Sequence, residues 1–393
     1  MKQALIFGAG KIARGFIGQL LYLSGFDITF VDVYKPIVDR LNELGSYHVH
    51  VLGDESLDSD VTGITALTFD EPDRIYDAFW KADAVFVSVG GKNLPAVGES
   101  VAAILARGGI QDHLQNIVVC ENWKDAASTF ERAVLEHLGD EDARRFEEHV
   151  GVSEAVLMRT ATQPDERLAA EHPEDVWVQS YWHLPIDRAR LKAPFPEVKC
   201  VELLDDFGNF LTQKMYTNNT SNAVIAYNAY LLGYDILAEA ANSPEISRRL
   251  DRAYEEINDT LVAALGVSRE SQEAFSQRAR AKYCDYTIVD KITRHAKDPI
   301  RKLGPADRLV APCRMAIEHG IEPKELVHAI ACALFFDAPG DESAAELAAM
   351  RREHGIPYVL EHVCKLDRDE PLYRMVLDAV EVVRAEGLAE GHE

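Results

Sequence analysis

Cysteine and metal-binding spacings are scarce in this sequence. The six cysteines stand singly and none forms a C-x-x-C pair, which is typical of reduced thiols rather than of a disulfide framework. His48 and His50 form an H-V-H tripeptide, but the sequence contains no H-E-x-x-H motif and no pairing of cysteine and histidine at zinc spacing. We therefore expect no metal in the mechanism.

The sequence also has few positively charged residues relative to acidic ones and no long apolar run. Basic residues number 41 against 65 acidic ones, which gives a formal net charge of -24. Such a surface repels phosphate backbones and anionic lipids, so neither nucleic acid nor a membrane is an expected partner, although a local basic pocket can still bind a small anion. No apolar run approaches the roughly 20 residues of a membrane span, and no signal-peptide layout precedes the first expected strand. The expected location is the cytoplasm.

A glycine-rich turn follows the first apolar run, residues 4–7. It reads GAGKIA, and apolar residues at helical spacing and then a second strand, DITFVDV, come after it. In a dinucleotide site Gly8 permits the tight turn, Gly10 lets the backbone approach the pyrophosphate, and Ala13 keeps the helix close to the sheet. Asp32 can accept hydrogen bonds from the adenosine ribose and repels a 2′-phosphate, which favours NAD over NADP. The residues expected to bind NAD are Gly8, Gly10, Lys11, Ile12, Ala13 and Asp32.

Strands and helices continue to alternate after this unit. Residues 83–91 and 116–122 are short apolar strands, followed by helical segments at 93–106 and 124–138, which indicates a parallel, doubly wound sheet. Asn122 ends the second of these strands, where a nicotinamide or substrate would lie, but it also stands where a helix cap is natural. The pattern alone favours the cap.

Helical periodicity dominates beyond residue 200, after a proline-containing connection that includes RARLKAPFPEV. The helical segments are 219–243, 245–265, 270–282, 305–319, 323–335, 341–354 and the tail after 370. The predicted fold is α/β: a Rossmann-type, doubly wound parallel sheet with an extension (residues 1–197), followed by a mainly α-helical substrate and catalytic domain (residues 198–393).

A polar cluster stands at the entrance of an apolar helical run, in QKMYTNNTSNAVIAY (residues 213–227). Hydride transfer needs a base for the alcohol proton and donors for the developing oxygen charge. Lys214, Asn219 and Asn222 are the right residue types, since burial makes a lysine a base and amides are neutral donors. A cap formed by Asn218 or Thr217, for a helix beginning at Asn219, would explain one asparagine but not the cluster.

Several segments together resemble the polyol-specific long-chain dehydrogenases and reductases, the mannitol dehydrogenase family. They are MKQALIFGAGKIARGFIGQLL, VDVYKPIVDRLNELGSYHVHV, CEN, EEHVGV, QKMYTNNTSNA and PIRKLGPADRLVAP. The resemblance implies that Lys214 is the general base, and that Asn219 and Asn122 polarise the reacting oxygen, so that Asn122 is catalytic and close to the cofactor. Two positions depart from the family pattern, because Asn222 stands where relatives carry a histidine and Met158 where they carry an aspartate. Asparagine can still hydrogen-bond a hydroxyl, whereas methionine cannot replace a carboxylate.

The basic segment KITRHAKDPIRKL offers cations for a phosphorylated substrate, or a solvated face with structural ion pairs. Arg294 and Lys302 match basic positions of the family, and with Asn222 they are the expected substrate contacts. The resemblance thus implies an NAD-dependent oxidoreductase that interconverts a polyol, or a polyol phosphate, and its ketose, as a monomer or a homodimer. Two alternatives stay open: a non-catalytic NAD(H)-binding regulator, and a related dehydrogenase that acts on a sugar acid such as a uronate.

Overall fold

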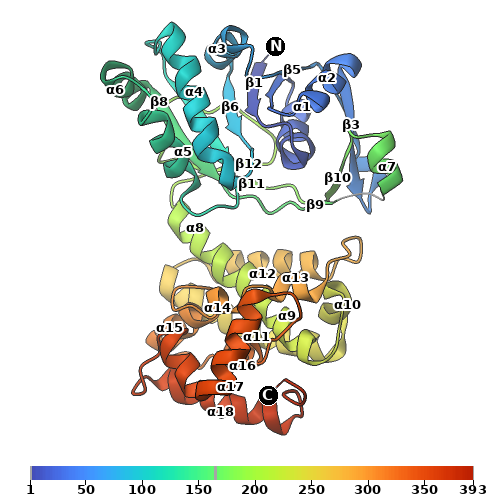
Figure 1. Cartoon of the computed structure of the whole chain (residues 1–393), viewed down its shortest axis with the longest axis vertical. Coiled ribbons are helices and arrows are strands. Elements are labelled where there is room, and N and C mark those ends of the chain that lie inside the picture. Colours follow the sequence, from blue (N-terminus) through green and yellow to red (C-terminus); the bar gives the residue numbers. More distant parts are fainter. Residues whose placement is uncertain (1, 163–165, 393) are drawn as a thin grey trace. The chain divides into compact units, whose positions relative to one another are not determined.

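The chain forms two compact units, Met1–Phe207 and Gly208–Glu393. The computed structural model describes residues 2–162 and 166–392. The strands lie in the first unit, whereas the described part of the second unit is built from helices (Figure 1). This arrangement confirms the predicted fold class.

The main sheet has eight strands in the order β12-β11-β8-β7-β6-β1-β2-β5. Every neighbouring pair is parallel except β8 and β11, which run antiparallel. The strands are β1 (Lys2–Phe7), β2 (Phe26–Val31), β5 (Ile64–Leu67), β6 (Ala84–Val87), β7 (Gln115–Cys120), β8 (Val150–Ala155), β11 (Leu184–Asp187) and β12 (Val201–Leu204). Because β12 pairs in this sheet, the first unit extends past residue 197.

Both faces of this sheet are buried, which explains the continuous apolar runs of its strands. Successive residues of β1 enter different cores: Ala4 and Ile6 join one cluster, and Leu5 and Phe7 the other. The predicted helices 93–106 and 124–138 correspond to α4 and α5. The helices of the first unit are the π-helix η1 (Ala13–Gly18), which follows the glycine turn, α1 (Gln19–Leu23), α2 (Lys35–Leu44), α3 (Pro72–Lys81), the short η3 (Gly91–Asn93), α4 (Leu94–Gly108), α5 (Ala126–Leu135), α6 (Asp140–His149) and α7 (Glu166–Glu171).

A second, smaller sheet has the order β4-β3-β10-β9. Its inner side chains belong to the same core as the even-numbered residues of β1, and Tyr47, Val49, Val51, Val61, Val176 and Val178 are its buried members there. The strands are β3 (Ser46–Leu52), β4 (Ser59–Thr62), β9 (Ala161–Thr162) and β10 (Val176–Gln179), and the short helix η2 (Glu55–Leu57) links β3 to β4.

The second unit surrounds one buried helix, α9, which contacts α11, α13 and α16. The periodic segment 219–243 was predicted as one helix but forms two, α9 and α10, because Gly233 between them adopts a φ of 78°. The elements are α8 (Phe207–Lys214), η4 (Met215–Asn219), α9 (Thr220–Leu231), α10 (Leu237–Asn242), α11 (Pro244–Leu265), α12 (Arg269–Tyr283), α13 (Ile292–Ala296), α14 (Pro299–Lys302), α15 (Val310–Glu318), α16 (Lys324–Ala333), α17 (Glu342–His362) and α18 (Pro371–Ala385). Within the described residues, none of the helices combines the length and the apolar character that crossing a membrane requires.

Candidate active site

In the turn after β1, Gly8 and Gly10 have different structural roles. Gly8 adopts a φ of +103°, and a Cβ at this position would lie 2.0 Å from the carbonyl oxygen of Ser88. Only glycine fits such a backbone. A Cβ at Gly10 would meet nothing within 4 Å, so this part of the turn is open on the side where a ligand can approach. Ala13 is fully buried against the sheet, and Ile12 is half-buried.

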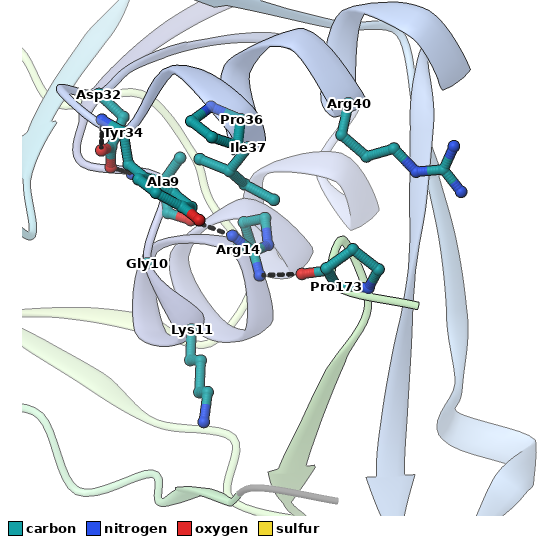
Figure 2. A pocket seen from close by; sticks show the side chains of 10 residues that line it. All are labelled: Ala9, Gly10, Lys11, Arg14, Asp32, Tyr34, Pro36, Ile37, Arg40 and Pro173. Atoms are coloured by element: carbon teal, nitrogen blue, oxygen red, sulfur yellow. Dashed lines mark hydrogen bonds between the residues drawn. The ribbon is translucent and has the colours of Figure 1, made fainter. Parts of the chain in front are cut away.

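A cavity of about 490 Å³ lies beside this turn. Residues of the turn, the end of β2, the first turn of α2 and the segment around Pro173 line it (Figure 2). Gly10, Lys11 and Asp32, three of the predicted cofactor residues, belong to the lining, whereas Gly8, Ile12 and Ala13 shape the turn behind it.

Asp32 is held in place by backbone donors. Its Oδ2 accepts the N–H of Ala9 at 2.6 Å, and its Oδ1 accepts the N–H of Tyr34 at 2.8 Å. Each carboxylate oxygen has a second lone pair with which it can accept a ligand hydroxyl. The carboxylate therefore presents a fixed negative charge to the cavity, which suits a ribose diol and opposes a phosphate.

Arg14 is a lining residue that the sequence motif did not single out. Its buried guanidinium donates to the carbonyl oxygens of Ala9 and Pro173, the latter at 3.3 Å (Figure 2). Burial lowers the pKa of Arg14, and burial together with the Arg14 charge lowers the pKa of Lys11. Two cations thus line a cavity beside the open backbone at Gly10, a combination that favours an anionic pyrophosphate.

Asn122 follows β7 in the first unit and is exposed. The helix after it begins only at Ala126, with Asp125 at the N-cap position, so the interpretation of Asn122 as a cap is wrong. The preceding residue, Glu121, accepts the backbone N–H of Gly90 at 2.6 Å, and burial raises the pKa of its carboxyl group. This bond links the segment after β7 to the segment after β6, at the carboxyl ends of two neighbouring strands where ligands of such sheets bind.

The other candidate catalytic residues lie in the second unit, at a π-helical turn. Lys214 ends α8, the π turn η4 follows without a break, and α9 begins at Thr220. Asn219 itself has helical angles, φ −75° and ψ −31°. The alternative of a cap at Thr217 or Asn218 is therefore excluded, because the helix does not start there but passes through. Single π turns inside α-helices are frequent at functional sites.

Part of the polar cluster at this turn is structural. The amide of Gln272 on α12 donates to the Thr217 hydroxyl at 3.0 Å, and Gln213 donates to Gln272 at the same distance. The Tyr283 hydroxyl donates to the carbonyl of Asn218 at 2.8 Å. These contacts satisfy buried polar groups, which would otherwise destabilise the fold.

Lys214 has the properties of a base. Burial, with the nearby positive charges of Lys282 and Arg308, lowers its pKa to about 8. A lysine whose pKa is near 8 can both accept and release a proton near neutral pH, whereas an exposed lysine stays protonated there. Neither Lys282 nor Arg308 was singled out from the sequence, although Arg308 lies in the quoted segment PIRKLGPADRLVAP.

The two asparagines have different surroundings. The Asn219 amide nitrogen lies 3.2 Å from the sulfur of Met215, one turn earlier. Asn222 is buried, and its Nδ2 lies 2.9 Å from Nδ1 of His295 on α13. The other ring nitrogen of His295, Nε2, lies 3.2 Å from Oδ2 of Asp290, and this contact is the main cause that lowers the pKa of Asp290.

Lys302 and Arg294, the two basic residues predicted to contact the substrate, have different surroundings. Lys302 is buried and donates to the carbonyl oxygen of His295, and burial with the charges of Arg308 and Arg301 lowers its pKa to about 7. The side chain of Arg294 is 69% exposed and pairs with Asp290 on the surface. The structure thus brings Lys302 together with the Asn222–His295 pair, whereas Arg294 is directed to solvent.

The Arg308 position depends on α9. The hydroxyl of Thr220 donates to the Arg308 carbonyl oxygen at 2.7 Å. The Arg308 guanidinium donates to Asp307 at 2.7 Å and is largely buried. The first turn of α9 therefore fixes a cation beside Lys214.

Met158, in the first unit, is buried, and the Tyr181 hydroxyl lies 3.5 Å from its sulfur. The neighbouring Arg159 is also buried and donates to the carbonyl oxygens of Gly15 and Gln179. Its guanidinium lies 4.4 Å from the centre of the Trp182 ring. The segment around Met158 therefore anchors the helix that follows the glycine turn.

Two family models together match nearly the whole chain. A family model described as "Mannitol dehydrogenase Rossmann domain" matches residues 2–200, and a second, "Mannitol dehydrogenase C-terminal domain", matches residues 206–382. A mannitol-1-phosphate 5-dehydrogenase of Bacillus pumilus (strain SAFR-032) is 33% identical over 382 residues, which cover 95% of this chain and 98% of that protein. The protein of the same name from Bacillus subtilis (strain 168) is 34% identical over 379 residues, covering 95% and 98%.

Solved structures agree on the fold. A substrate-free D-sorbitol dehydrogenase has a TM-score of 0.80 at 15% identity, and the match covers 99% of this chain and 94% of that one. The mannitol 2-dehydrogenase of Pseudomonas fluorescens, solved with NAD and D-mannitol, has a TM-score of 0.66 at 15% identity, covering 99% and 93%.

Proposed function

Because the chain belongs to the mannitol dehydrogenase family, we propose that it interconverts mannitol 1-phosphate and fructose 6-phosphate. It is an NAD-dependent oxidoreductase that acts on the CH–OH group of a polyol. The finer assignment, to the phosphate ester, rests on the relatives that bear that activity in their names and on the charges around Lys214.

The cofactor site fits NAD. The open backbone at Gly10 and the cations Lys11 and Arg14 suit the pyrophosphate, and the fixed carboxylate of Asp32 suits the adenosine ribose. When bound, NAD supplies the acceptor for the hydride that leaves the alcohol carbon.

Lys214 handles the proton in this proposal. In its neutral form it takes the proton of the reacting hydroxyl, and in its charged form it returns that proton when the ketose is reduced. The amide of Asn219, one turn away on the same helix, donates a hydrogen bond to the same oxygen and stabilises its charge. For Asn122, in the first unit, we propose the same donor role on the family resemblance alone.

The single observation that favours a phosphorylated substrate is a group of buried cations around Lys214. The positive charges of Lys282 and Arg308 act on Lys214, and that of Arg308 also acts on the buried Lys302, in a protein whose net charge is -24. Burial lowers the pKa values of Lys282 and Lys302, and the charge of Arg308, which also lowers the pKa of Lys214, lowers that of Lys302 further. A bound dianion would offset this repulsion and accept charge-assisted hydrogen bonds from the same groups.

The test follows NADH absorbance with fructose 6-phosphate, free fructose and a uronate as substrates. Two charge-assisted hydrogen bonds, each worth about 1.5 kcal/mol, predict that kcat/KM is on the order of 100-fold higher for fructose 6-phosphate than for fructose. Lys302→Met should remove a large part of this preference, whereas Lys324→Met, at an exposed lysine of the same unit, should not. Equal rates with both ketoses, or a higher rate with the uronate, would refute the assignment to the phosphate ester.

A further inference from the structure

Two imidazoles lie side by side on one face of β3. His48 and His50 are two residues apart in a strand, a spacing that places their side chains on the same face. Their ring centres are 4.2 Å apart, and both side chains are partly exposed. Neither residue belongs to the cofactor cavity or to the lysine–asparagine cluster.

Asp58, just after η2, brings a carboxylate oxygen to both rings. Its Oδ2 lies 3.2 Å from Nε2 of His48 and 3.7 Å from Nδ1 of His50. One ligand atom from each of the three residues lies within 4.8 Å of the other two. A tetrahedral zinc ion, with bonds of about 2.0–2.1 Å, requires ligand atoms that are about 3.4 Å apart, so the two separations between Asp58 and the imidazoles are already close to those of a coordination sphere.

The other ring nitrogen of each imidazole lies close to a second carboxylate. Nδ1 of His48 lies 2.7 Å from Oδ1 of Asp60, and Nε2 of His50 lies 3.8 Å from Oδ2 of Asp175. Histidines that bind metals usually have such an outer carboxylate, which fixes the ring and its tautomer. Both histidines therefore have the inner and outer neighbours of a metal ligand.

Backbone donors fix the carboxylates in these directions. The N–H of Val51 donates to Oδ1 of Asp58, and the N–H of His48 donates to Oδ1 of Asp175, both at 2.7 Å. In each case one oxygen is held by the main chain and the other faces an imidazole. A simple ion pair between His48 and its two carboxylates does not explain why His50 turns Nδ1 toward the same oxygen of Asp58.

We propose that His48, His50 and Asp58 bind one divalent transition-metal ion of the zinc class, with a water molecule as the fourth ligand. The site is structural, since none of its residues lines the cofactor cavity or belongs to the lysine–asparagine cluster, and it does not depend on the proposed function. It joins β3 to the segment that follows η2. Through Asp175 it also adjoins Glu174, whose carboxylate pairs at 3.2 Å with Arg40 in the lining of the cofactor cavity.

The test titrates Zn²⁺ into the metal-stripped full-length protein by calorimetry and records the visible spectrum with Co²⁺. We expect one equivalent to bind, with a tetrahedral Co²⁺ spectrum and a higher Tm in the presence of Zn²⁺. Asp58→Asn and His50→Gln should abolish these effects. Asp60→Asn removes only an outer carboxylate and should weaken binding about 10- to 100-fold.

His113→Gln, at an exposed histidine of the same unit, is the matched control and should bind Zn²⁺ as the unchanged protein does. The affinity for NADH, measured for every variant, reports whether its first unit is folded. The proposal is overturned if the unchanged protein shows neither a stoichiometric heat nor a tetrahedral Co²⁺ spectrum. It is equally overturned if folded His50→Gln or Asp60→Asn protein binds Zn²⁺ with unchanged affinity, in which case the cluster is only a network of ion pairs.

Discussion

The side-chain amide of Asn222 donates a hydrogen bond to Nδ1 of His295 across 2.9 Å, joining α9 to α13. Because Nδ1 accepts, the ring proton lies on Nε2, which faces Asp290 at 3.2 Å. The nitrogen of the Asn222 amide is thus directed to His295, and we infer that its carbonyl oxygen is the group offered to a substrate hydroxyl. The structure thus places an imidazole, supplied from another helix, beside the position at which the family resemblance implies a histidine.

The first prediction concerns this positioning. His295→Ala should raise KM about fivefold, the equivalent of one hydrogen bond of about 1 kcal/mol, and should change kcat much less. Asn222→Ala should have a similar effect, and the double variant should be no worse than the more affected single one, because the two residues act as a unit. His319→Ala, at an exposed histidine of the same unit, serves as control. Additive effects of the two substitutions in steady-state kinetics would argue against the pairing.

The second prediction concerns the pH dependence of the reaction. The pKa of Lys214, lowered to about 8, means that the neutral base forms as pH rises through 8. The kcat/KM of polyol oxidation should therefore increase with pH and level off above about 8, while that of ketose reduction, which needs the charged acid, should fall in the same range. Lys214→Ala should lower kcat about 10²- to 10⁴-fold and remove this dependence. Lys324→Ala should keep the kcat and the pH dependence of the unchanged protein. A Lys214→Ala protein whose rate depends on pH as that of the unchanged protein does would exclude Lys214 as the base.

Local patterns were sufficient for the fold and for part of the site. The turn at Gly8 and Gly10, the strand that ends just before Asp32 and the alternation of strands and helices are encoded by neighbouring residues, so they could be predicted. The cap that the pattern favours at Asn122, and the alternative of a cap at Thr217 or Asn218, do not form, and both fail for a related reason. A polar residue before an apolar run looks like a cap, but only the backbone course shows that α8 continues through a π turn into α9.

Other parts of the site depend on contacts between distant segments. Arg14 reaches the cofactor cavity because β10 and the Pro173 segment pack beside it, and Arg308 lies near Lys214 because Thr220 holds its carbonyl group. The sequence spacing of Arg14 and Arg308 does not predict where either side chain lies. The same holds for Asp58, which completes the cluster with the H-V-H tripeptide only after the chain has turned through η2.

The last prediction separates the folding role of one glycine from the binding role of another. Gly8→Ala introduces a Cβ at a φ of +103° and 2.0 Å from the Ser88 carbonyl oxygen, so it should lower the free energy of unfolding by more than about 2 kcal/mol. Gly10→Ala meets no protein atom within 4 Å and should change stability by no more than about 0.5 kcal/mol. Its methyl group nevertheless occupies the open side of the turn, and the affinity for NADH should therefore fall more than about tenfold. Denaturant unfolding and fluorescence titration with NADH measure the two effects. If Gly10→Ala binds NADH as tightly as the unchanged protein, the pyrophosphate does not approach this turn, because the added methyl group would occupy the space that the pyrophosphate needs.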